Sequence, residues 1–229
     1  FSSLQFIFIF MPIFFGCYYI VPNKIKNFVL LIGSLCFYSV GTIHNPEHFI
    51  LFILSIVADF AIGIWIEKFP ARKKVLLAAG IIFHLINFAV FKYSGFVINE
   101  MGRLNPNFNF TADIVLPIGI SFYTFQGISY IVDVYRGNAK AERSLLRYAV
   151  YISMFEQLIA GPIVTYGQVE KELYKRKIKV SSVLKGMGEF IFGLGLKVLL
   201  ANPIGKLWSQ TCAIGFESIS TPLAWMAII

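Results

Sequence analysis

Runs of sequence with few or no charged residues recur along this chain of 229 residues, and they constrain its fold more than any other feature. Residues 1–23 contain no charge and would form a helix about 34 Å long, which is enough to cross a bilayer. Charged residues make up only 14% of the chain, too few to cover a soluble protein, in which about 25% is usual. The sequence therefore predicts an all-α, polytopic transmembrane protein with about seven membrane segments and part of another. The later runs cover residues 27–40, 49–66, 75–91, 114–132, 148–164 and 186–200, and a last one begins near Pro222.

The last apolar run reaches Ile229 without a helix cap or a basic anchor. No internal repeat and no low-complexity tract divides the sequence before it. We therefore expect residues 1–229 to form a single transmembrane domain that is truncated at its C-terminal end.

The distribution of basic residues predicts the topology, because cytoplasmic loops are rich in Lys and Arg. Lys24 and Lys26 follow the first run, the turn at residues 41–48 has no basic residue, and four follow the third run at residues 68–74. Only two basic residues flank the long connection expected at residues 93–113. This alternation predicts a multi-pass protein of the inner or plasma membrane with its N-terminus outside. The net charge of +8 on so apolar a chain indicates a lipid bilayer, and not nucleic acid, as the anionic partner.

The apolar run at residues 148–164 does not fit simple alternation, because basic clusters at residues 136–147 and 171–185 lie on both sides of it. Either the positive-inside pattern fails here, or the run enters the membrane and returns to the same side. We favour re-entry because Gly161 and Pro162 interrupt helical structure within the run. Non-helical backbone at membrane depth is tolerated only inside protein or beside a wet cavity.

Four residues of this run are candidates for the wall of a substrate tunnel. Glu156 and Gln157 directly precede the stretch that contains Gly161 and Pro162. A broken helix leaves backbone donors and acceptors free to bind a substrate or water, and polar side chains at this depth are expected to face protein or a wet cavity.

Three further candidates belong to the run at residues 114–132 and its end. Gln126 lies inside the run, and Asp133 and Arg136 follow it at the predicted cytoplasmic boundary. Each has a structural alternative. Gln126 could serve close helix packing, while Asp133 and Arg136 could anchor the helix at the membrane interface.

Other polar residues have structural interpretations of similar weight. Asp59 lies inside an apolar run, so its carboxylate should face protein, either in a polar tunnel or in a hydrogen bond to a neighbouring helix. His84 and Asn87 share one face of an expected helix, where a histidine can relay protons or bridge two helices. The H-x-x-E-H string at residues 44–48 matches a zinc-protease motif, but Pro46 disfavours the continuous helix that the motif needs. We therefore expect no metal site.

Several short stretches recur in order along the whole chain, namely residues 1–4 (FSSL), 35–38 (LCFY), 91–93 (FKY), 116–122 (LPIGISF), 125–126 (FQ), 129–130 (SY), 133–137 (DVYRG) and 157–163 (QLIAGPI). Together these stretches resemble the bacterial membrane-bound O-acyltransferases. The branch that they resemble most is the membrane subunit of alginate O-acetylation, while the D-alanyl transferase of teichoic acids is more distant.

The resemblance implies that the chain is the N-terminal half of a ring of helices around a thin centre. It implies transfer of an acyl group, acetyl or D-alanyl, from a cytoplasmic donor such as acetyl-CoA or an acyl carrier to a hydroxyl of an extracellular polysaccharide. It implies no bound cofactor, a possible extracellular acetylation partner, and a catalytic histidine beyond Ile229, so no residue here is assigned a catalytic role and this chain alone is expected to be inactive. A transporter or flippase, and a non-enzymatic scaffold that docks an acetylation partner, are the alternatives.

Overall fold

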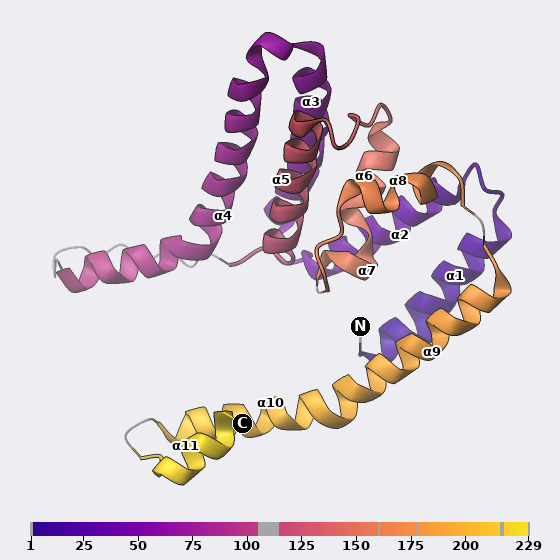
Figure 1. Cartoon of the computed structure of the whole chain (residues 1–229). Coiled ribbons are helices and arrows are strands. Elements are labelled where there is room, and N and C mark those ends of the chain that lie inside the picture. The colour runs from indigo at the N-terminus through magenta and orange to yellow at the C-terminus, as the bar shows by residue number, and fades with distance from the viewer. Residues whose placement is uncertain (1, 105–114, 160, 177, 216–217, 229) are drawn as a thin grey trace. The chain divides into compact units, whose positions relative to one another are not determined.

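The computed structural model describes residues 2–104, 115–159, 161–176, 178–215 and 218–228. Every regular element in this part of the chain is helical, and Figure 1 shows the order of the helices. The predicted all-α class is therefore confirmed. The number of membrane segments stays a prediction.

The chain divides into two compact units, which are described separately. The larger unit comprises residues 17–176, and the smaller unit comprises residues 1–16 and 177–229. The expectation of a single transmembrane domain is not tested by this division. The helices of the larger unit are α2 (Lys26–Gly41), α3 (Pro46–Lys68), a 3-10 turn η2 (Pro70–Arg72), α4 (Lys73–Leu104), α5 (Ile120–Arg136), α6 (Leu145–Ser153), α7 (Phe155–Leu158) and α8 (Tyr166–Tyr174).

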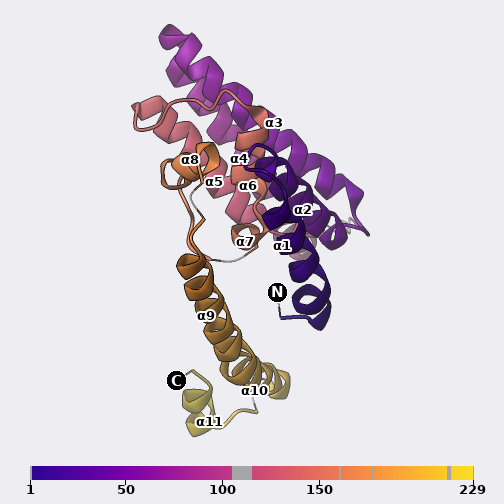
Figure 2. The ribbon, with the colours of Figure 1, turned by 90° about the vertical axis from the view of Figure 1, so that its right-hand side faces the viewer.

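Helices α3, α4 and α5 pack against one another, and Figure 2 shows them side by side in the larger unit. Helix α3 begins with Pro46 in its first turn, where a missing backbone N–H costs nothing. Glu47 in the first turn and Lys68 in the last turn complement the helix dipole. These local signals favour the start of α3 at Pro46 and its end at Lys68.

The core of the larger unit is aromatic. Tyr38 of α2 and Tyr123 of α5 both pack on Phe52 of α3, with ring centroids 4.3 and 5.1 Å apart. A second group joins Tyr130 of α5 to Tyr148 of α6, whose ring centroids are 4.5 Å apart. Aromatic pairs of this kind contribute about 0.5–1.5 kcal/mol each beyond the burial of their surface. They connect α2 and α6 to the three packed helices.

Two helical stretches are long and apolar enough to cross a membrane by length and composition, namely Pro46–Lys68 and Pro70–Leu104. Helical segments Phe6–Ile20 and Lys26–Gly41 are apolar but shorter. The run at residues 148–164 is not one helix, because α6 ends at Ser153.

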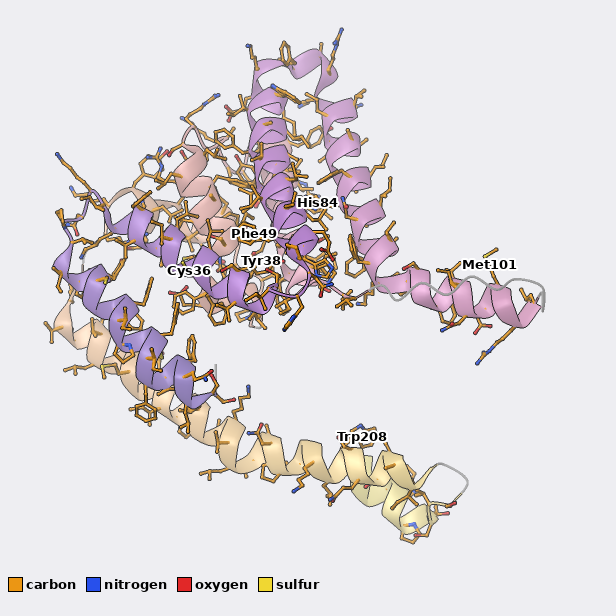
Figure 3. All side chains as sticks on the ribbon, turned by 180° about the vertical axis from the view of Figure 1, so that it is seen from behind. Cys36, Tyr38, Phe49, His84, Met101 and Trp208 are labelled. Carbon is orange, nitrogen blue, oxygen red and sulfur yellow. The ribbon has the colours of Figure 1, made fainter. Side chains whose placement is uncertain are left out.

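The predicted end of the helix at residues 75–91 is wrong. Helix α4 continues to Leu104, so more than half of the connection expected at residues 93–113 is helical, and the rest of that connection lies outside the described residues. No proline interrupts this stretch, and apolar residues continue to recur along it. Figure 1 shows that α4 changes direction partway along its length. Figure 3 places His84 on the stretch beside α3 and Met101 beyond the change of direction.

The smaller unit contains the start of α1 (Met11–Ile20) and a helical run formed by α9 (Val180–Leu196), η3 (Lys197–Ala201) and α10 (Asn202–Ile214), followed by α11 (Thr221–Ile228). A wide π-helical turn, η1 (Phe6–Phe10), precedes α1, and η3 is a second one. Each of these two turns ends two residues before a proline, Pro12 or Pro203.

The position of these prolines explains the two wide turns. A proline inside a helix lacks the N–H that bonds to the carbonyl four residues earlier, and its ring clashes with that carbonyl. In both turns the residue just before the proline bonds five residues back: Met11 N–H donates to Phe6 O, and Asn202 N–H donates to Lys197 O. The helix therefore passes each proline by widening locally.

Candidate functional site

The predicted interruption within residues 148–164 is confirmed. Helix α6 ends at Ser153, Met154 has a non-helical ψ of 115°, and α7 contributes a single turn that ends at Leu158. Among the described residues that follow, none is helical until Tyr166. Gly161 has a φ of +125°, a conformation that side chains rarely adopt, which explains the glycine there. Figure 1 shows α6 and α7 as separate short helices.

Side chains satisfy the backbone groups that the break at Met154 would otherwise leave unpaired. The Phe155 N–H donates to Ser34 Oγ of α2 at 3.3 Å, so it no longer bonds to the carbonyl of Tyr151. That carbonyl instead accepts a 2.6 Å hydrogen bond from Gln157 Nε2. The Tyr151 hydroxyl donates to Val164 O at 2.9 Å and holds the extended stretch against α6. We call residues 148–164 the discontinuous segment. Specific hydrogen bonds stabilise its break, and the side chain of Gln157 takes the place of the Phe155 N–H as donor to the Tyr151 carbonyl.

The four candidates of this segment lie in different environments. Gln157 is buried, while Glu156, Gly161 and Pro162 are exposed. Glu156 therefore does not line a closed interior in the described part of the chain. Of the four, Gln157 is the residue with a direct hydrogen bond that shapes the segment.

The start of α5 lies directly against the end of α7, a contact that the sequence did not predict. Gly119 has a φ of +72°, and a Cβ built there would lie 2.6 Å from the Leu158 carbonyl oxygen. Only glycine satisfies both requirements. Two of the stretches that carry the family resemblance, residues 116–122 and 157–163, therefore meet at this point.

Gln126, Asp133 and Arg136 are spread along α5 and do not form one site. Gln126 is buried, and neither atom of its amide has a hydrogen-bond partner among the described residues. The Asp133 carbonyl accepts hydrogen bonds from the backbone N–H groups of Asn138 and Ala139 after the helix end. Arg136 is exposed. Of the three candidates, Gln126 is thus the buried polar side chain within α5, while Asp133 and Arg136 lie in its last turn.

Asp59 and His84 form a buried pair between α3 and α4, which confirms that the Asp59 carboxylate faces protein and bonds to a neighbouring helix. Asp59 Oδ1 lies 2.7 Å from His84 Nε2, and both side chains are 1% exposed. Gly127 of α5 makes room for them, because a Cβ at that position would lie 2.7 Å from His84 Nε2. Asn87 does not join the pair, since its amide donates to Phe83 O of its own helix.

The structure also shows a buried carboxylate that sequence reasoning missed. Glu142, in the loop between α5 and α6, is 1% exposed and accepts hydrogen bonds from side chains and backbone. The available sequence signal was an acidic residue inside the basic cluster at residues 136–147. The donors, at 2.6–3.2 Å, are Arg147 Nε and Nη2, the hydroxyls of Tyr166 and Tyr174, and the backbone N–H groups of Arg143 and Ser144.

These contacts fix the charge of Glu142 and the position of its loop. Burial raises the pKa of the Glu142 carboxyl, but the hydrogen bonds from Arg147 and Tyr166 outweigh burial and hold the pKa below its ordinary value. A second carboxylate, Glu67 of α3, accepts a 2.6 Å hydrogen bond from the backbone N–H of Ala141 and pairs with Arg143 at 2.5 Å. The loop is therefore tied to α3 on one side and to α8 on the other.

The H-x-x-E-H string does not form the single helical face that a zinc site requires. Helix α3 begins at Pro46, so His44 lies before it and is exposed. His48 is buried, with its ring centroid 5.6 Å from that of Phe91. Within the part of the chain that the structure describes, no group of three metal-binding side chains comes together.

The chain is similar over its whole length to curated polysaccharide O-acetylating proteins. It is 32% identical to the probable alginate O-acetylase AlgI of Pseudomonas aeruginosa, with 100% of this chain and 44% of that protein aligned. It is 31% identical to the probable alginate O-acetylase AlgI of Azotobacter vinelandii, with 100% of this chain and 46% of that protein aligned. It is 28% identical to the peptidoglycan O-acetyltransferase of Helicobacter pylori, with 99% of this chain and 49% of that protein aligned.

The chain thus spans about half the length of the curated relatives that it matches. No protein-family model and no solved structure matches it. The relatives and the two membrane-capable helices together indicate a membrane protein. The resemblance predicted from the motifs is confirmed, because the chain is similar over its whole length to probable alginate O-acetylases and to a peptidoglycan O-acetyltransferase.

Proposed function

We propose that the chain is the N-terminal part of a membrane O-acyltransferase that acetylates a hydroxyl of an extracellular polysaccharide. The observation that carries this proposal is similarity along the whole chain to relatives whose names specify O-acetylation of alginate or peptidoglycan. The donor is proposed to be acetyl-CoA or an acyl carrier on the cytoplasmic side. The proposed partners are the bilayer, the polysaccharide and an extracellular acetylation protein.

The proposed topology has about seven membrane segments with the N-terminus outside, one of them re-entrant. The nine residues of α6 are too few to cross the hydrocarbon core, for which a helix needs about 20 residues. The segment turns at Met154, adds the single helical turn α7, and has no further helix among its described residues before Tyr166, which supports entry and return. Basic residues on both sides of it support the same arrangement.

In this proposal the present residues shape the passage, and a histidine supplied by the rest of the protein acts as general base on the acceptor hydroxyl. Gln157 holds the break between α6 and α7 in place through the Tyr151 carbonyl. Gly119 lets the start of α5 close against the same turn. The buried and unpaired amide of Gln126 supports a polar interior nearby on α5. These residues position the discontinuous segment and keep bulk water from the reaction.

The test is O-acetylation of the polysaccharide by the full-length protein carrying Gln157→Ala. Loss of the Tyr151 hydrogen bond should displace the segment, and we expect acetylation per molecule of membrane-inserted protein to fall by about ten-fold or more. The matched control is Gln210→Ala, at an exposed position of α10, which should acetylate as the parent does.

A second variant keeps the test informative if Gln157→Ala lowers the amount of folded protein. Glu156→Gln changes an exposed neighbour and should leave folding intact while altering the charge of the segment. Unchanged acetylation in both variants would show that the discontinuous segment takes no part in the reaction.

A further inference from the structure

Helix α4 is longer than one membrane crossing requires. Its 32 residues form a helix about 48 Å long. We call residues 73–91 the first stretch of α4 and residues 92–104 its second stretch. The first stretch contains the apolar run and is about 28 Å long, close to the thickness of the hydrocarbon core, which is about 30 Å. The second stretch, about 20 Å long, therefore extends beyond the core.

The second stretch runs crosswise to the helices that could span the membrane. The first stretch packs beside α3, where His84 Nε2 lies 2.7 Å from Asp59 Oδ1. Phe91, at the end of the first stretch, contacts His48 in the first turn of α3, with ring centroids 5.6 Å apart. Figures 1 and 3 show that the part of α4 with Met101 then runs away from α3. Because α3 and α4 are both long and apolar enough to cross a bilayer, a stretch crosswise to them lies along the bilayer surface.

A stripe of exposed apolar side chains continues from the first stretch of α4 into the second. Residues three or four positions apart share one face of a helix. The members of the stripe recur at this spacing and are each 46–86% exposed, so the described part of the chain does not cover them. They are Ile86, Val90, Tyr93, Val97, Met101 and Leu104. His84, which contacts α3, lies on the opposite side of the helix.

The direction in which α4 bends turns this stripe toward the membrane. On the first stretch the stripe faces away from α3, and the second stretch bends toward that same side (Figures 1 and 3). The stripe therefore lies on the inner side of the bend. Its members in the second stretch face back toward the level of the hydrocarbon core, at the extracellular surface in the proposed topology.

The other side of the second stretch is suited to water and lipid headgroups. Lys92, Asn99 and Arg103 lie on this side and are exposed. Phe96 is the apolar exception among them. Glu100, at the edge of the stripe, is paired with Arg103 at 2.7 Å, which balances its charge. Basic side chains and tyrosine, both present here, are typical of helices at the membrane–water interface.

We propose that the second stretch of α4 is an amphipathic helix that binds the bilayer surface, with its part of the stripe inserted among the lipid chains. Lipid is the occupant that the observations favour, because the stripe is continuous with the side of the first stretch that faces away from α3. A helix of this kind buries its apolar face about 5–10 Å into the boundary between headgroups and acyl chains. The inference goes beyond acyl transfer and rests only on the proposed membrane crossing by α3 and α4.

The experiment measures the depth of nitroxide labels on the full-length protein in vesicles of phosphatidylethanolamine and phosphatidylglycerol. Collisions with oxygen, which dissolves in lipid, and with a nickel chelate, which stays in water, report the depth of each label. We expect labels at Val97→Cys and Met101→Cys to lie about 5–10 Å below the headgroups. The matched control, Asn99→Cys on the polar side, should meet the nickel chelate at least about ten-fold more often than Met101→Cys does. The cysteines replaced by serine beforehand include Cys17, Cys36 and Cys212.

A label at Ile82→Cys, one turn before the stripe and exposed, tests the membrane crossing separately and should lie near the bilayer centre, about 15 Å from either face. Met101→Glu should move the Val97→Cys label toward water, whereas Asn99→Glu should leave it in place. Equal access of the nickel chelate to Val97→Cys, Met101→Cys and Asn99→Cys would mean that the second stretch lies in water and would overturn the proposal. Exclusion of both reagents from Val97→Cys and Met101→Cys would overturn it in favour of a protein cover, and a water-exposed Ile82→Cys label would remove its premise.

Discussion

Gly127 is the position where a single added methyl group should lower the stability of the folded chain most. A Cβ at residue 127 would lie 2.3 Å from one Asp59 carboxylate oxygen and 2.7 Å from His84 Nε2. To restore ordinary contact, the carboxylate would have to retreat by about 1 Å, which carries the 2.7 Å hydrogen bond to His84 beyond its normal range. Both groups are 1% exposed, so solvent cannot replace the lost bond.

The expected cost of Gly127→Ala follows from these contacts. Overpacking costs about 1–3 kcal/mol, and leaving buried polar groups unpaired costs about 1–3 kcal/mol more. The higher helix propensity of alanine compared with glycine offsets about 1 kcal/mol of this cost. The net loss is about 1–5 kcal/mol, which corresponds to a fall of roughly 2–20 °C in melting temperature for a domain of this size.

The assay is the fraction of chain that remains monodisperse by size-exclusion chromatography after heating in detergent. The matched control is Gly95→Ala, inside α4, where a Cβ meets nothing within 4 Å and should leave stability equal or slightly higher. Equal heat resistance of Gly127→Ala and the parent would refute the reasoning, and so would equal losses in Gly127→Ala and Gly95→Ala.

Two further predictions concern the loop and helix that flank the discontinuous segment. Glu142→Gln should destabilise the chain by about 3–5 kcal/mol, because it breaks a buried ion pair, whereas Glu100→Gln, at an exposed pair, should cost less than about 1 kcal/mol. Since the folded pKa of Glu142 lies below its ordinary value of 4.5, its stabilisation is complete above pH 4.5 and is lost as the pH falls through the lower folded value. Melting temperatures measured between pH 7 and more acidic buffers should therefore fall more steeply for the parent than for Glu142→Gln, and parallel curves would contradict this assignment. Thr165→Ala removes the reciprocal hydrogen bonds that Thr165 and Gln168 make at the start of α8, and the melting temperature should fall by the equivalent of about 1 kcal/mol. Gln168→Ala should give a similar loss, and no loss in either variant would mean that this cap does not hold α8.

The sequence was sufficient for features that depend on local chemistry. The helical class followed from the apolar runs, and the break before Gly161 and Pro162 followed from the known effect of these residues on helices. The burial of Asp59 followed from the cost of a carboxylate in lipid. The family resemblance rested on the order of several motifs, and the comparisons bear it out.

Features that depend on pairing between distant residues could not be predicted in this way. Nothing local shows that Asp59 meets His84, which lies 25 residues away, or that Gly119 touches Leu158. Glu142 lies among basic residues and would ordinarily be solvated. Arg147 of α6 is only five residues away, but Tyr166 reaches Glu142 only because α8 folds back over the loop. The end of α4 at Leu104 was missed because the apolar run stops at residue 91, before Lys92, although a charged residue alone does not end a helix.

The wide turns before Pro12 and Pro203 have a consequence for how this protein can change in evolution. A π-helical turn is an α-helix that holds one surplus residue. Deletion of one residue from the stretch 197–201 would convert the π-helical turn into an ordinary α-helical turn, and the flanking helices would keep the same side chains on the same face. The same deletion within α9 would rotate all residues beyond it by about 100° about the helix axis. The two turns are therefore places within the described helices of the smaller unit where homologous chains can differ in length by one residue while their side chains still meet the same neighbours.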